Sequence, residues 1–193
     1  GRGLTGKDVA QLILDTNGIR GVRIEETRNF MGDHYDPRDK TLRLSPDNYH
    51  GRSVAAAGIA AHEVGHAVQH ADGYAPMSFR QTMVPIANLG TSAGVWFVMI
   101  GVMLGMTGLA KLGVGLFAAF VVFTLVTLPV EIDASRRATA ALASTSIIAP
   151  HEMTGVRQVL TAAAATYLAA AVGAILQLVY WAARAGLIGG QDD

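Results

Sequence analysis

The chain contains no cysteine, carries no net charge and has few charged side chains. Without cysteine, disulfide scaffolds, thiol catalysis and thiolate metal sites are excluded, so a metal could be held only by His, Asp or Glu. The 15 basic side chains balance the 15 acidic ones, which argues against nucleic acid as a partner. Only 16% of the residues are charged, against about 25% in an average soluble domain, and 51% are hydrophobic. This composition also excludes a disordered chain.

The few charges are unevenly distributed along the chain. Residues 1–80 contain 10 Lys or Arg side chains, whereas residues 81–193 contain 5. The second part includes three stretches of 30, 19 and 26 residues without any charge. About 20 apolar residues are enough to cross a bilayer, and the helices of a soluble core, the alternative interpretation, are usually shorter. We therefore predict transmembrane helices near residues 86–107, 112–130 and 159–183.

The first 80 residues have the patterns of a small mixed α and β part. Residues 4–17 predict an amphipathic helix that begins with a capping box. Residues 22–26 and 41–44 alternate between apolar and polar side chains, which predicts two strands in a small antiparallel ribbon. A polar, turn-rich segment at residues 31–40 separates the two strands. Residues 53–71, rich in alanine, predict a buried helix.

This buried helix carries the motif His62-Glu63-Val64-Gly65-His66. Residues four apart lie on one face of a helix, so the two imidazoles can bind one metal ion. Glu63 is adjacent and can act as the general base toward a water molecule. Neutral imidazole suits zinc, and the motif is typical of the zincin metallopeptidases. The alternative, two histidines packed in a core without partners, would be energetically costly.

A catalytic zinc site usually has three protein ligands, so one more ligand must come from elsewhere. His70 lies on the same helical stripe, but it is about 12 Å along the helix from His62, which one zinc ion cannot bridge. Glu131 directly follows the 19 uncharged residues of the second predicted span. A carboxylate at that position has little structural reason to be there, and we therefore favour it as the third ligand. Asp133 is the alternative ligand.

Five segments of the chain resemble the bacterial neutral zinc metallopeptidases, which are integral membrane zincins. They are residues 33–38, 42–45, 60–70, 127–138 and 162–167. The resemblance covers nearly the whole chain. It implies a zinc-dependent endopeptidase of the gluzincin type, with one zinc ion per chain and Glu131 as third ligand. It also implies a membrane helix ahead of Gly1.

Two features of the expected site are left open by the sequence. Related membrane zincins carry an aspartate four residues after the ligand glutamate, where this chain has Ser135. A partner for a ligand histidine is expected, and the sequence does not decide whether the nearby Asp133 fills that role. The oxyanion of the transition state needs a further donor. The candidates, chosen from sequence position alone, are His151, Arg136, Arg137 and Tyr167.

The segments ahead of the motif suggest a place for the substrate. By analogy with zincins, we expect the strand Thr41, Leu42, Arg43 and Leu44 to be the edge strand that holds an extended peptide through main-chain hydrogen bonds. The block at residues 33–38 has no assigned chemistry. A turn that braces the ribbon is the favoured interpretation, and a direct catalytic role is the alternative.

The predicted fold is a mainly α integral membrane protein: a minimal zincin-like α+β part, residues 1–80, joined to a membrane part, residues 81–193. Three spans place residues 1–80 and 131–157 on the same side of the membrane, and these segments contain 10 and 3 Lys or Arg. Positive-inside bias assigns that side to the cytoplasm. We therefore expect a multi-pass protein of the bacterial cytoplasmic (inner) membrane, with its active site facing the cytoplasm.

Peptides or membrane proteins are the expected substrates, and the lipid bilayer is the expected surroundings. Two other functions use the same residues: a non-catalytic membrane protein with a structural zinc site, and a metal transporter. A structural site has no use for Glu63 and normally needs four protein ligands. A transporter is disfavoured because no predicted span carries a charge in its middle. The physiological substrate and the oligomeric state cannot be read from the sequence.

Overall fold

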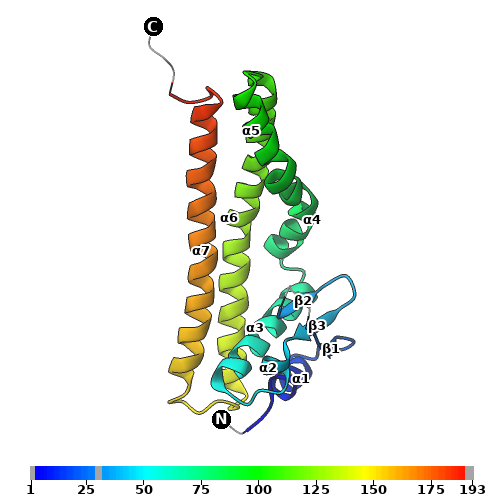
Figure 1. Cartoon of the computed structure of the whole chain (residues 1–193). Coiled ribbons are helices and arrows are strands. Elements are labelled where there is room, and N and C mark those ends of the chain that lie inside the picture. The colour runs from blue at the N-terminus through cyan, green and yellow to red at the C-terminus, as the bar shows by residue number, and fades with distance from the viewer. Residues whose placement is uncertain (1–2, 29–31, 190–193) are drawn as a thin grey trace. The chain divides into compact units, whose positions relative to one another are not determined.

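The computed structural model describes residues 3–28 and 32–189 of the chain (Figure 1). Most of these residues are helical, and the strands form one three-stranded sheet. Within the described residues, three helical segments are long and apolar enough to cross a membrane: Ala75–Met103, Thr107–Ser144 and Met153–Arg184. The protein is therefore a mainly α membrane protein with a small β part, as its composition predicts.

The chain forms two compact units, each built from an early and a late part of the sequence. The first unit combines Gly1–Ala75 with Val130–Ala165, and the second combines Pro76–Pro129 with Thr166–Asp193. The long helix α6 (Thr107–Ser144) passes through Pro129 without a break and contributes residues to both units. The division of the chain into a cytoplasmic part and a membrane part stays a prediction.

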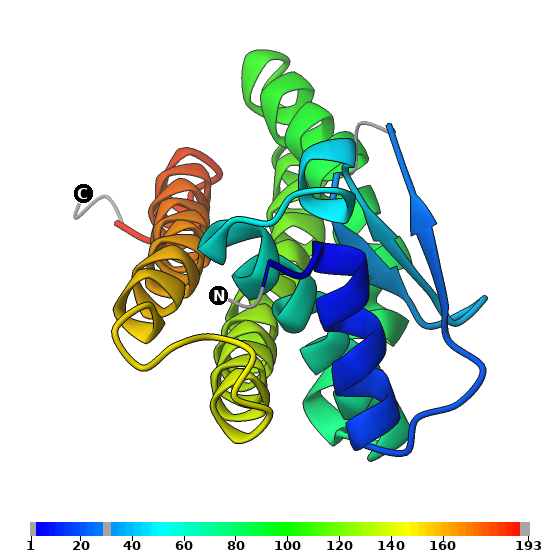
Figure 2. The ribbon, with the colours of Figure 1, turned by 90° about the horizontal axis from the view of Figure 1, so that it is seen from below.

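Two capped helices build the helical side of the first unit. Helix α1 (Gly6–Thr16) begins at the predicted capping box, in which the Thr5 and Asp8 side chains each accept a hydrogen bond from the backbone N–H of the other. Helix α3 (Val54–Ala71) begins at Ser53, whose hydroxyl accepts a hydrogen bond from a backbone N–H of the first turn. Helix α1 packs on α3 beside the short helix α2 (Pro46–Tyr49) (Figure 2), and its buried residues include Val9, Ile13 and Leu14.

The sheet differs from the predicted antiparallel ribbon. Strands β1 (Arg23–Glu26) and β3 (Thr41–Leu44) form where they are predicted, but they pair in parallel. A third strand, β2 (His34–Asp36), lies within the segment that was predicted to be a turn, and it pairs with β3 in an antiparallel manner. The tight turn at residues 37–40 brings β2 back against one edge of β3. Only the parallel side is then left for β1.

The strand order β1-β3-β2 corrects the predicted substrate strand. Thr41, Leu42, Arg43 and Leu44 form the central strand, whose main-chain groups are paired on both sides. The prediction that this strand is an edge for a peptide is therefore wrong. Leu42 and Leu44 are fully buried, as expected of a strand in the middle of a small sheet.

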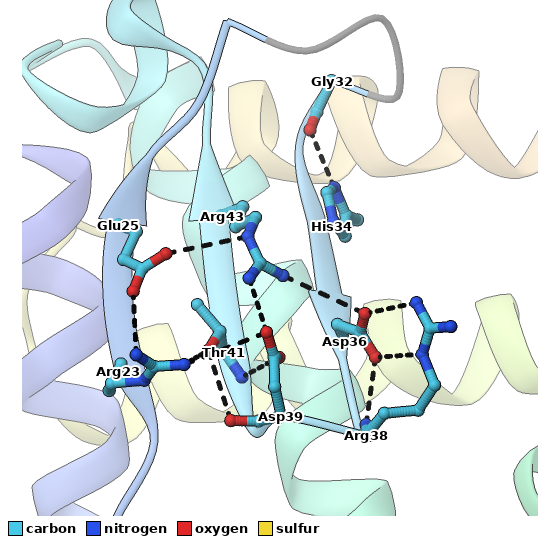
Figure 3. A network of polar contacts seen from close by, with 9 residues as sticks. All are labelled: Arg23, Glu25, Gly32, His34, Asp36, Arg38, Asp39, Thr41 and Arg43. Atoms are coloured by element: carbon cyan, nitrogen blue, oxygen red, sulfur yellow. Dashed lines mark hydrogen bonds and ion pairs between the residues drawn. The ribbon is translucent and has the colours of Figure 1, made fainter.

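One face of the sheet is covered by a network of charged side chains (Figure 3). Arg43 donates a hydrogen bond to Asp39 at 2.5 Å and lies within 4.0 Å of Asp36 and 3.7 Å of Glu25. Asp36 accepts two hydrogen bonds from the guanidinium of Arg38, at 3.0 and 2.7 Å. These contacts connect all three strands and the turn between β2 and β3. They support the interpretation of the block at residues 33–38 as a structural brace.

In the second unit, glycines allow the first and second membrane helices to pack closely. Helix α4 (Ala75–Leu89), a π-helical turn (Gly90–Gly94) and α5 (Val95–Met103) form the first segment. A Cβ atom at Gly101 would lie 2.8 Å from the Cα of Ala110 on α6, so a larger residue would force the two helices apart. Helix α7 (Met153–Arg184) completes the apolar clusters of this unit. The helical segments are longer than the predicted spans because they continue into flanking polar sequence.

Candidate metal centre

The two histidines of the motif share one face of α3. Their side chains are nearly buried, with 9% exposure for His62 and 7% for His66. The centroids of the two rings are 4.8 Å apart, and the ring planes are almost perpendicular, at 85°. The Nε2 atoms of both rings lie next to a single carboxylate oxygen, which comes from a distant part of the chain.

That carboxylate belongs to Glu131 on α6, the residue favoured as third ligand from the sequence. Its Oε2 atom lies 3.0 Å from Nε2 of His62 and 3.5 Å from Nε2 of His66. Only 2% of Glu131 is exposed. One ligand atom from each of these three residues lies within 4.8 Å of the others. The segment after the second span therefore meets the motif helix.

The geometry of these three side chains fits a zinc ion. Two atoms bound tetrahedrally at about 2.1 Å from one zinc lie about 3.4 Å apart, close to the separations between Glu131 and the two imidazoles. Burial lowers the pKa of His66, but the hydrogen bond to Glu131 and the charges of Glu63 and Glu131 outweigh burial and raise it above its ordinary value. The same negative charges would stabilise a bound cation.

Glu63 lies on α3 next to His62 and is 8% exposed. Within residues 3–28 and 32–189, its carboxylate forms no hydrogen bond or ion pair with another side chain. A carboxylate accepts hydrogen bonds, including those of a water molecule. Glu63 is therefore chemically suited to accept a proton.

Helices α3 and α6 approach each other closely at Gly65, inside the motif. A Cβ atom at this position would lie 2.5 Å from the backbone oxygen of Ala134 and 3.1 Å from its Cα atom. Such distances are too short for a side chain, so only glycine allows this approach. Gly65 thereby brings the segment that carries Glu131 against the two histidines.

Glu131 and Asp133 have different surroundings in the structure. Asp133 accepts hydrogen bonds at 2.6 Å from Arg136 and at 2.6 Å from Arg137, and it does not belong to the group of three ligand atoms. Ser135 contacts His62, and its Oγ atom lies 3.1 Å from Nδ1 of that ring. Serine thus occupies the position where related zincins were expected to carry an aspartate.

The candidate stabilisers of the transition state belong to several different elements. Arg137 binds Asp133 and Asp72, and the side chain of Arg136 is 79% exposed. His151 is exposed in the connection between α6 and α7, and Tyr167 lies on α7 in the second unit. The role of each of these residues stays a prediction.

Sequence reasoning missed Gln69, which lies on the same helix three residues after His66. Its side chain is fully buried, and its Oε1 atom lies 3.0 Å from Nδ1 of His66. The available signal was a polar residue one turn after His66, on a helix whose other polar residues are those of the motif and His70. His70, which was not favoured as a ligand, instead contacts the hydroxyl of Tyr35 at 2.9 Å, and this hydrogen bond connects α3 to β2.

Comparisons with known proteins identify the family of the chain. Residues 1–186 match the protein family described as "Putative neutral zinc metallopeptidase". The chain is 42% identical over 177 residues to the "Putative membrane protease YugP" of Bacillus subtilis, and the match covers 92% of this chain and 79% of that protein. No solved structure matches the chain.

Proposed function

Because the chain belongs to the neutral zinc metallopeptidase family, we propose that it is a membrane endopeptidase of the gluzincin type. The observation that supports this most is the convergence of His62, His66 and Glu131, three buried ligands contributed by two helices. We assign them one zinc ion per chain. The motif glutamate, Glu63, is then the catalytic base.

The proposed reaction is the hydrolysis of a peptide bond. When bound, Zn²⁺ supplies a Lewis acid that makes a water molecule nucleophilic near neutral pH. The Glu63 carboxylate accepts the proton that this water loses as its oxygen attacks the scissile carbonyl carbon. Glu63 then donates the proton to the amide nitrogen as the C–N bond breaks. The hydrolysis leaves a new carboxylate and a new amine.

The number of ligands supports a catalytic site over a structural one. Structural zinc sites are closed by four protein ligands, whereas catalytic sites keep one position for water or substrate. Among the described residues, the group of ligands contains three side chains. Glu63, next to the first histidine, would have no role as a base in a purely structural site.

Because β3 is the central strand of the sheet, we propose β2 as the strand that holds the substrate. Within the described residues, this strand pairs with β3 alone, so its other side can accept an extended peptide through main-chain hydrogen bonds. The hydrogen bond between Tyr35 and His70 holds β2 next to the motif helix. We propose a peptide segment of a membrane-associated protein as the substrate, because the site belongs to a protein with three candidate spans.

The test compares zinc content and peptidase activity in the purified full chain, with casein as substrate. Glu63→Gln should keep one zinc ion per chain and lose activity by about 10²- to 10⁴-fold, because only the base is removed. Glu131→Ala should lose both zinc and activity. Equal cleavage by the wild type and Glu63→Gln, or full zinc binding by Glu131→Ala, would contradict the proposal.

A further inference from the structure

Gln69 is a fully buried amide at the centre of a hydrogen-bond network. Its Nε2 atom donates to the backbone oxygen of Val130 at 2.8 Å and to Oδ2 of Asp133 at 3.0 Å. Its Oε1 atom lies 3.0 Å from Nδ1 of His66. The side chain thus connects one proposed zinc ligand to the helix segment that carries another, Glu131.

The partners of Gln69 determine which way its amide group faces. A backbone carbonyl and a carboxylate can only accept hydrogen bonds, so the NH₂ group must point toward Val130 and Asp133. The amide oxygen must then point toward His66. Because that oxygen can only accept, Nδ1 of His66 must carry the hydrogen. When the ring is neutral, as a metal ligand must be, its lone pair is consequently on Nε2, the atom that faces Glu131.

Asp133 is itself fixed as an acceptor. It receives hydrogen bonds from two guanidinium groups, those of Arg136 and Arg137. Arg137 also donates to Asp72 at the C-terminal end of α3, at 2.5 Å. These ion pairs hold the Asp133 carboxylate against both helices. A flipped Gln69 amide would place its oxygen against that carboxylate, so the flip is strongly disfavoured.

The other histidine has no such constraint. Nδ1 of His62 faces the hydroxyl of Ser135, and a hydroxyl group can either donate or accept. Ser135 therefore supports the His62 ring without selecting the ring nitrogen that carries the proton. At Nδ1, the ring nitrogen away from Glu131, the described residues therefore fix a hydrogen on His66 but leave His62 undetermined.

We propose that Gln69 is a positioning residue for the metal centre, and that Asp133 sets its orientation. Gln69 holds His66 in the Nδ1–H tautomer and presents Nε2 to the metal. Partners of this kind on ligand histidines typically change metal affinity by 10- to 100-fold. The inference rests on the proposed function, because it requires that His66 binds zinc.

The first test is the zinc affinity of the full-length chain in detergent, measured by competition with a chromophoric chelator. Gln69→Met keeps the length of the side chain but removes the amide, and should weaken zinc binding by about 10- to 100-fold. Gln158→Met changes an exposed glutamine on α7 of the same unit and should stay within twofold of the wild type. Wild-type affinity in Gln69→Met would overturn the inference.

A double-mutant cycle tests the role of Asp133. Asp133→Asn introduces a donor next to Gln69 and allows its amide to flip, so it should weaken zinc binding several-fold. In the Gln69→Met background the same substitution should have little further effect, because the amide that it reorients is gone. Fully additive losses would show that the two residues act separately and would contradict the proposed connection.

Nuclear magnetic resonance of ¹⁵N-histidine in the zinc-loaded wild type tests the tautomer without any variant that must fold. The His66 signal should show a hydrogen on Nδ1 and the metal on Nε2, and the reverse arrangement would overturn the inference. A merely structural role for Gln69 does not predict this signature. If the wild type binds no zinc at all, the proposed function fails rather than the role of Gln69.

Discussion

At the scale of single residues, the carboxylates of the first unit differ in the groups that face them. Glu131 faces two imidazoles, Asp133 faces two guanidinium groups, and Glu63 has no side-chain partner among the described residues. These surroundings suit three different tasks: ligand, structural anchor and proton acceptor. The sequence left Glu131 and Asp133 as alternatives because they are two positions apart in one charged segment. Their side chains leave α6 in different directions and so contact different groups.

Asp36, in the charged network on the sheet, leads to a prediction about pH. Hydrogen bonds from Arg38 lower its pKa to about 2, and the charge of Arg43 acts in the same direction. Because this pKa is lower in the folded than in the unfolded state, the carboxylate stabilises the fold above about pH 4. That stabilisation is lost as the pH falls toward 2.

The corresponding measurement compares melting temperatures of the wild type and Asp36→Asn between pH 6 and pH 2.5. At pH 6 the variant should be less stable by about 1 kcal/mol, since Arg38 is mostly exposed and its ion pair is screened by solvent. The difference should shrink as the solution is acidified. A difference that stays constant over this range would contradict the assignment, and Asp47→Asn, which changes an exposed carboxylate on α2, serves as the control.

At the scale of elements, the helices and strands that have local signals were predicted well. The capping box of α1, the bounds of α3 and the strands β1 and β3 are confirmed. The pairing of the strands was predicted wrongly. Alternation shows that a segment is a strand but not which neighbour it has, and β2, with three residues, is too short to show a pattern.

The approach of α3 to α6 gives a prediction for Gly65. Gly65→Ala places a methyl group against the backbone of Ala134, so the helices must separate or the variant must unfold. We expect a loss of about 1–3 kcal/mol in the free energy of unfolding, together with weaker zinc binding. Thermal or denaturant unfolding of the metal-free protein measures the first effect, and chelator competition measures the second.

Gly58 on the same helix provides a matched control. A Cβ atom there would have an ordinary contact, with its nearest neighbour, Cγ1 of Val156, at 3.7 Å. Gly58→Ala should therefore be neutral or stabilising by up to about 1 kcal/mol, because alanine favours the helix. Equal stability of the two variants would show that the contact at Gly65 does not limit the approach of the helices.

At the scale of the whole molecule, the proposed orientation depends on three spans and on the distribution of positive charge. An odd number of spans places the C-terminus on the opposite side from the metal centre. A reporter enzyme fused after Asp193 should therefore lie outside the cytoplasm. The same reporter inserted in the connection between α6 and α7, at residues 145–152, should lie inside. A cytoplasmic signal from the C-terminal fusion would contradict the three-span orientation.

The amino-acid sequence by itself determined the features that depend on neighbours along the chain. The motif places two histidines on one helical face, the uncharged stretches are long enough for membrane helices, and the lack of cysteine limits the ligands to His, Asp and Glu. Only the tertiary structure decided the strand order, the distinction between Glu131 and Asp133, and the partners Gln69 and Ser135. His62 contacts Glu131 and Ser135 across 69 and 73 positions, Gln69 contacts Asp133 across 64, and the strands pair in space; such contacts leave no periodicity in the sequence. The contacts of the metal centre depend on the close approach of α3 and α6 at Gly65, which the packing of the folded chain determines.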